Sequence, residues 1–138
     1  MRIFLALALL LALLSPSAAQ DAAAPWQATV SGQIEAFRAQ DGAAALALAG
    51  SGFRRQFAGR PEAFYAAILA SGYQPVVQSR SHTFGDFTRL SDSVVAQVVR
   101  LVGPDQGLYE ALYQLQDEAG LGWRVVGVVL RKEEGVGI

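Results

Sequence analysis

The chain has 138 residues, 52% of them apolar, and its 11 lysines and arginines against 12 aspartates and glutamates give a formal net charge of −1. This length and composition exclude a disordered chain, a collagen-like fibre and a multi-domain enzyme. The sequence has no cysteine, which excludes a disulfide scaffold, thiol chemistry and thiolate metal sites. Because the charge is nearly balanced and no basic stripe is present, nucleic acid is not expected as a partner.

The N-terminus has the pattern of an export signal. Ile3 to Leu14 is an unbroken apolar run that follows Arg2. As a helix it would span about 18 Å, well short of the roughly 30 Å hydrocarbon core of a membrane. Small residues follow it and end at Ala19, as a signal peptidase requires. We predict a signal peptide over residues 1–19, cleaved after Ala19 to leave a periplasmic chain; a buried N-terminal helix is the alternative.

The remainder has the composition of a single domain. Without the leader the apolar share falls to about 48%, which is ordinary for a soluble globular domain. No later stretch approaches the length of a membrane span, so none is expected after cleavage. We predict a short tail over residues 20–25, one α+β domain over 26–131 and a C-terminal tail over 132–138.

The first predicted helix begins at Pro25, which suits a first helical turn, and runs to about Gln40. Its apolar residues recur at spacings of four, four and three, and therefore share one face: Trp26, Val30, Ile34 and Phe37. Asp41 is placed to cap a second helix over residues 43–49.

Two further helical segments follow. One turn over residues 53–57 is expected to carry Arg54 and Arg55 outward. The third full helix begins at Pro61 and ends at Gly72, which supplies a left-handed C-cap. Three N-terminal helices, with one extra turn between the second and third, are therefore expected.

The pattern changes after the third helix. Residues 73–77 are predicted to be extended, with their proline confined to an edge or a bend. Residues 79–90 are predicted to form a strand. Phe84 and Phe87 would lie on opposite faces of a regular strand, so a bulge is expected at Gly85.

Three more strands are predicted over residues 94–102, 108–116 and 123–130, separated by turns. The middle one alternates, with these residues on one side: Tyr109, Ala111, Tyr113 and Leu115. The other two are apolar on both faces and need a partner on each. Helices followed by such a meander predict an α+β fold, in which helices pack on a curved antiparallel sheet of four to five strands. The sheet is long enough to enclose a hollow that holds side chains or a ligand.

Motifs for catalysis are missing. The sequence has no nucleophile elbow and no phosphate-binding glycine loop. His82 is the only histidine, so it cannot build a zinc site. It would serve as a general base if it lined the hollow, but a histidine at a sheet edge is the favoured interpretation. We predict no catalytic residue, no metal site and no cofactor. The weak candidates for lining a cavity are Tyr65, His82, Tyr109 and Tyr113, although such tyrosines are more often half-buried core.

An ordered set of short motifs spans the mature chain: Gln33-Ile34-Glu35-Ala36-Phe37-Arg38, then Asp41, Phe57 and Phe64, then Gly72-Tyr73-x-Pro75-Val76, and finally Gly122-Trp123-Arg124-Val125-x-Gly127-Val128. By this set the chain resembles a bacterial family of exported domains of unknown function, numbered 4864 and typical of alpha-proteobacteria. The resemblance implies a nuclear-transport-factor-2-like (cystatin-like) cone, with three N-terminal helices and a curved sheet around a cavity. The acid–base residues of isomerases and cyclases with that fold have no matching pattern here, so no activity is carried over.

Three functions stay open. The leading one is a non-enzymatic periplasmic module that binds a small apolar ligand or a protein partner through its cavity or sheet face. A cofactor-independent isomerase, cyclase or hydratase would need at least two of five residues at one open pocket: Tyr65, His82, Asp86, Tyr109 and Tyr113. The third is a structural subunit that dimerises through its sheet.

Overall fold

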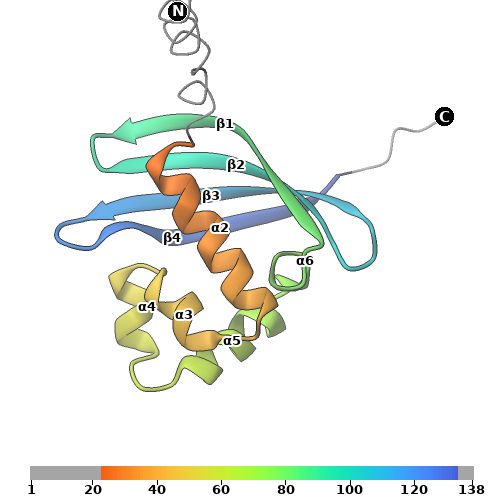
Figure 1. Cartoon of the computed structure of the whole chain (residues 1–138), viewed down its shortest axis with the longest axis horizontal. Helices are drawn as coiled ribbons and strands as arrows, with labels where there is room; N and C mark the ends of the chain where they lie inside the picture. Colours follow the sequence, from red (N-terminus) through yellow and green to blue (C-terminus); the bar gives the residue numbers. More distant parts are fainter. Residues whose placement is uncertain (1–22, 134–138) are drawn as a thin grey trace, which may run out of the picture.

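The computed structural model describes residues 23–133. The predicted signal peptide with its cleavage site, and residues 134–138 of the predicted C-terminal tail, lie outside the described residues. Five helices come first in this part of the chain (Figure 1): α2 (Pro25–Arg38), α3 (Gly42–Ala47), α4 (Ser51–Gln56), α5 (Pro61–Ala70) and α6 (Gln74–Val77). Four strands follow: β1 (Ser81–Ser91), β2 (Val94–Val102), β3 (Leu108–Glu118) and β4 (Gly122–Lys132).

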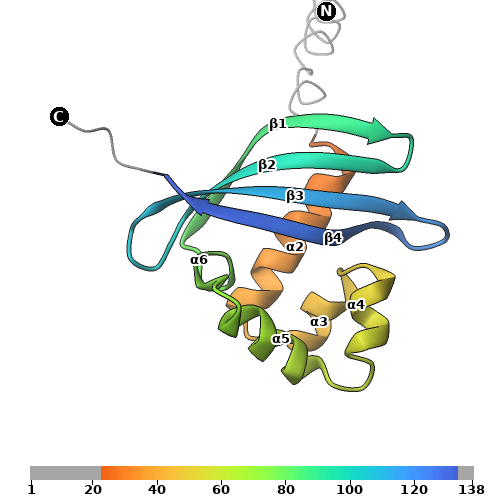
Figure 2. The same ribbon diagram turned by 180° about the vertical axis from the view of Figure 1, so that it is seen from behind.

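The four strands form an open antiparallel sheet in chain order, β1-β2-β3-β4. Helix α2 crosses one face of this sheet, and α3, α4 and α5 gather on the same side near β4 (Figures 1 and 2). The view from behind shows the other face without a described helix over it (Figure 2). The α+β class and the antiparallel meander are therefore as predicted.

Local sequence signals account for the first two helices. The apolar stripe predicted for the first helix is buried along α2, from Trp26 to Phe37. The side chain of Asp41 accepts a 3.0 Å hydrogen bond from the backbone N–H of Ala44, and so caps α3 as expected. After α5, Gly72 has φ +93°, the left-handed conformation predicted for it.

The prediction of an extended segment over residues 73–77 is wrong, because α6 occupies it. Pro75 lies in the first turn of α6, where its missing N–H would have no partner within the helix in any case. The helical turn buries Val76 and Val77, one in each of the two core clusters. With α4 in place of a single turn, the described part has five helices where three were expected.

The bulge expected in the first strand is present. Phe84 pairs with Val99 and Phe87 pairs with Gln97, so two residues of β1 oppose one residue of β2. The extra residue brings Phe84 and Phe87 to the helix-covered face. There the ring of Phe87 lies 4.8 Å from that of Trp26.

The core has two parts. The first lies between α2 and the sheet and includes Trp26, whose ring is 5.3 Å from that of Trp123. The second lies among the helices and centres on Phe64, which contacts three other aromatic rings: Phe37, Phe53 and Phe57. None of the helices within residues 23–133 is long and apolar enough to cross a membrane.

Arg54 does not point outward as expected. Its Nη2 lies 2.8 Å from Oε1 of Glu118, which ties α4 to the end of β3. The other oxygen of Glu118 accepts a 2.9 Å hydrogen bond from the N–H of Ser51 at the start of α4. Glu118 lies more than sixty positions from Arg54 along the chain, so the local pattern of arginines gave no sign of this ion pair. Arg55 is exposed, as predicted.

Candidate ligand-binding cavity

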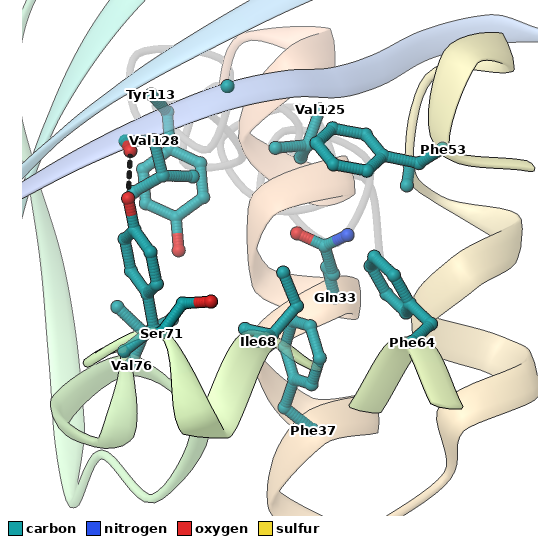
Figure 3. Close-up of a pocket in the computed structure, with 13 residues that line it drawn as sticks. Gln33, Phe37, Phe53, Phe64, Ile68, Ser71, Val76, Tyr113, Val125 and Val128 are labelled. Atoms are coloured by element: carbon teal, nitrogen blue, oxygen red, sulfur yellow. Dashed lines mark hydrogen bonds between the residues drawn. The ribbon is translucent and has the colours of Figure 1, made fainter. Parts of the chain in front are cut away.

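A cavity of about 340 Å³ lies where the two parts of the core meet. It is bounded by the second half of α2, by α4 and α5, and by β3 and β4 (Figure 3). The residues that line it are mostly apolar or aromatic: Gln33, Phe37, Ala49, Phe53, Phe64, Ile68, Ser71, Tyr73, Val76, Tyr113, Val125, Gly127 and Val128. None of these described lining residues carries a charge.

A close backbone contact holds one wall in place. The N–H of Val125 in β4 donates to the carbonyl of Leu48, and the N–H of Gly50 donates back to the carbonyl of Val125, at 2.9 and 2.8 Å. A Cβ at Gly50 would lie 2.7 Å from Cγ1 of Val126, so a larger residue here would have to displace that side chain. The junction of α3 and α4 is thereby docked on β4, which places Phe53 at the cavity.

Alternation along β3 places Tyr113 on the same side as Ala111 and Leu115, as the sequence predicted, and in the structure this side is the helix-covered face. Its side chain is completely buried, and within the described residues its hydroxyl has no hydrogen-bond partner. Figure 3 shows the hydroxyl pointing from the strand into the space above α5. Burial raises the pKa of the Tyr113 hydroxyl well above its usual value, so the group stays a protonated donor.

Two other polar side chains at the cavity are already engaged. The hydroxyl of Tyr73 donates a 2.7 Å hydrogen bond to the carbonyl of Val128. The amide nitrogen of Gln33 donates to the carbonyl of Ala45 at 3.0 Å, which fixes the orientation of the amide. The carbonyl end of Gln33 is left directed toward the cavity interior (Figure 3).

The structure does not bring the four candidate residues together. Of them, only Tyr113 lines the cavity. Tyr65 borders a separate groove with Arg38 and Arg80. His82 lies on the edge strand β1, where its Nε2 is 2.9 Å from the hydroxyl of Ser31, and burial lowers its pKa below the usual value.

Tyr109 lies at the far end of β3. Its hydroxyl donates to Asp105 at 2.9 Å, and this hydrogen bond raises the pKa of Tyr109. His82 borders the same hollow at this end of the sheet, but its Nε2 is engaged with the Ser31 hydroxyl. Asp86 is exposed in the bulge of β1. In the described part of the chain, no group of three or more histidines, aspartates and glutamates is arranged to hold a metal ion.

Sequence reasoning did not identify most of the lining. The spacing in the first helix predicts that Phe37 lies on an apolar face, and both Phe37 and Phe64 belong to the family motifs, but no sequence pattern marks Gln33 or Ile68 as a neighbour of a cavity. These residues come from helices far apart in the sequence. Their only local signal is the apolar face of each helix, and a filled core produces the same signal.

Fold and site together define an α+β protein with an open four-stranded antiparallel sheet and an uncharged cavity between sheet and helices. The chain belongs to the family described as Domain of unknown function (DUF4864), which it matches over residues 19–138. No curated protein and no solved structure matches the chain.

Proposed function

We propose that this protein is a non-enzymatic binding module that holds a small apolar ligand in the cavity between α2, α5 and β4. The observation that carries this proposal is the cavity itself, about 340 Å³ in volume and lined by aromatic and aliphatic side chains without a charge. Small-molecule sites are typically concave and mostly apolar, with volumes of about 300–1,000 Å³ and a few placed polar groups. Tyr113 and Gln33 would be those polar groups.

The same geometry argues against the enzymatic alternative. That alternative needs two titratable candidates at one pocket, and of the five considered only Tyr113 lines this cavity. His82 and Tyr109 do border one hollow at the far end of β3, but Nε2 of His82 is engaged with the Ser31 hydroxyl and the Tyr109 hydroxyl donates to Asp105. A tyrosine hydroxyl kept protonated by burial can donate a hydrogen bond, but it is a poor proton acceptor. The other polar lining residues are a glutamine, a serine and a tyrosine, none of which serves as a base at neutral pH unaided.

We also propose that the protein is exported to the periplasm and that its fold is a nuclear-transport-factor-2-like cone. The family match begins at residue 19, next to the predicted cleavage site, which is consistent with a leader that precedes the family domain. Helices packed on one face of a meandering sheet, with a cavity between them, are the features expected of such a cone.

Native mass spectrometry of the purified protein tests the binding proposal. The wild type is expected to retain, or to take up from added hydrophobic extracts, a species of small-molecule mass. Ile68→Trp enlarges a side chain that lines the cavity and should abolish this adduct. Ala66→Trp adds the same ring on the exposed side of α5 and should leave the adduct in place. Equal adducts in both variants would contradict binding in the cavity.

A second candidate function, self-association through the sheet, is favoured by the uncovered face. Val98, Leu112 and Val129 pair across β2, β3 and β4 on this face. Leu112 and Val129 are 45% and 68% exposed. A second copy of the chain would bury this row by two-fold symmetry.

Sedimentation of the wild type at several concentrations tests self-association. A dimer is expected that Val129→Lys dissociates, because a charge would be buried at the interface. Leu121→Lys, at an exposed residue in the turn between β3 and β4, should leave the dimer intact. A wild type that is monomeric at every concentration would rule this function out.

A further inference from the structure

The hydroxyl of Tyr113 restricts what the cavity can bind. It is a buried donor without an acceptor among the described residues. The other polar side chains at the cavity, those of Gln33, Ser71 and Tyr73, make their hydrogen bonds to backbone carbonyls, and none of their oxygens accepts from Tyr113. A buried donor without an acceptor is costly, so a ligand that supplies the acceptor gains an affinity advantage of roughly tenfold or more.

The lining also restricts the charge of the ligand. No lysine, arginine or histidine is among the described lining residues, and no aspartate or glutamate is either. A carboxylate or an ammonium group inside the cavity would therefore lose its hydration without gaining a partner of opposite charge. A neutral ligand avoids this loss.

Volume sets the size of the ligand. An apolar cavity of about 150 Å³ holds benzene, and this cavity, at about 340 Å³, is a little more than twice as large. Two fused rings, which share two atoms and so are less than twice the size of benzene, fit inside it and leave room for a substituent. The aromatic rings of Phe37, Phe53 and Phe64 on its helical side suit a flat or gently curved apolar body.

We infer that the cavity takes a neutral molecule of about two fused rings that bears an atom able to accept a hydrogen bond from the Tyr113 hydroxyl. This inference rests on the proposed function, since it names the class of ligand for the same cavity. Tyr113 is then the specificity-determining residue, and the apolar wall supplies most of the affinity.

Calorimetric titration with three probes of nearly equal shape tests the inference. Naphthalene has no acceptor, whereas quinoline and isoquinoline each have one ring nitrogen that accepts a hydrogen bond. The tighter of these two is expected to bind the wild type roughly tenfold more strongly than naphthalene. In Tyr113→Phe this advantage should vanish while naphthalene still binds. Tyr65→Phe, which removes a hydroxyl outside the cavity, should keep the advantage. A fourth probe, naphthoate, should not bind the wild type.

The possible failures are distinguishable. If naphthalene binds but neither nitrogen-containing probe binds more tightly, or if their advantage survives in Tyr113→Phe, the inference about Tyr113 is wrong and the proposed function stands. Naphthoate binding as tightly as naphthalene would overturn the requirement for neutrality. If none of the probes binds, the proposed function and the inference both fail. Naphthalene binding to Tyr113→Phe also shows that this variant keeps its cavity.

Discussion

Nε1 of Trp26 donates a 2.7 Å hydrogen bond to Oε1 of Gln97, an amide that lies completely buried in the middle of β2. The amide nitrogen of Gln97 donates in turn to the carbonyls of Gly85 and Val98, at 2.9 and 2.8 Å. One polar side chain in the core therefore joins α2 to the bulge of β1 and leaves none of its own groups unpaired.

This contact predicts that Gln97→Leu destabilises the protein by about 3 kcal/mol, since the Trp26 N–H and the carbonyls of Gly85 and Val98 lose their partners. Chemical denaturation measures the change. Gln114→Leu makes the same substitution on the exposed face of β3 and should alter stability by less than about 0.5 kcal/mol. Equal effects of the two substitutions would show that the buried network contributes nothing.

Removing the hydroxyl from each of two tyrosines at the cavity should change the stability of the protein in opposite directions. Tyr113→Phe removes a buried group that has no partner in the described part of the protein, and should stabilise the ligand-free protein by about 1 kcal/mol. Tyr73→Phe removes the donor to the Val128 carbonyl and should destabilise it by about the same amount.

Thermal unfolding of the two variants beside the wild type checks this pair. Each variant is the control for the other, because both lose one phenolic oxygen at the same cavity. A loss of stability in Tyr113→Phe would mean that its hydroxyl is already satisfied, and would weaken its assignment as a donor to ligand.

The carboxylate of Glu118 should make stability depend on pH. The hydrogen bond from the Ser51 N–H, together with the ion pair to Arg54, lowers the pKa of Glu118 below its usual value. A group with a lowered pKa in the folded state stabilises the fold fully above its unfolded pKa of about 4.3. This contribution disappears as pH falls through the lower, folded value.

Glu118→Gln is therefore expected to lower the free energy of unfolding at pH 7 by no more than about 1 kcal/mol, because the pair is partly exposed. The difference from wild type should shrink as pH falls from about 5 to about 3. Denaturation curves at a series of pH values measure it, and Asp92→Asn, at an exposed turn, should match the wild type throughout. A difference that grew toward acid pH would contradict the stated direction of the pKa shift.

Processing at the N-terminus is open to a direct check. Expression of the whole chain in a bacterium with a periplasm should yield a protein in the periplasmic fraction whose first residue is Gln20. N-terminal sequencing and intact mass establish this. Replacing Ala19 by an arginine should block processing, since the peptidase requires a small residue there. Intact Met1 on cytoplasmic wild-type protein would contradict export.

Signals that act within a few residues were readable from the sequence. The apolar stripe of α2, the Asp41 cap and the bulge between Phe84 and Phe87 each follow from local spacing. Segment 73–77 was misjudged because Pro75 fits both an extended segment and the first turn of a helix. Burial of Val76 and Val77 decides between them, and that depends on the rest of the fold.

In the candidate site, too, local signals were readable from the sequence and contacts between distant elements were not. Alternation in β3 was enough to place Tyr113 on the same side of the strand as Ala111 and Leu115. That its hydroxyl lacks a partner depends on neighbours from α5 and α6, which approach only in the folded chain. The Arg54–Glu118 pair was missed for the same reason, because its two members lie on elements far apart in the sequence.

An apolar ligand is proposed to occupy the cavity between α2, α5 and β4. A nuclear magnetic resonance titration of the processed protein with naphthalene tests it most directly, because it locates the bound molecule. Binding in the cavity predicts methyl shifts concentrated at Ile68, Val125 and Val128, with those of Leu112 and Val129 on the uncovered face unchanged. Shifts confined to Leu112 and Val129, or no saturable shifts at all, would contradict the claim.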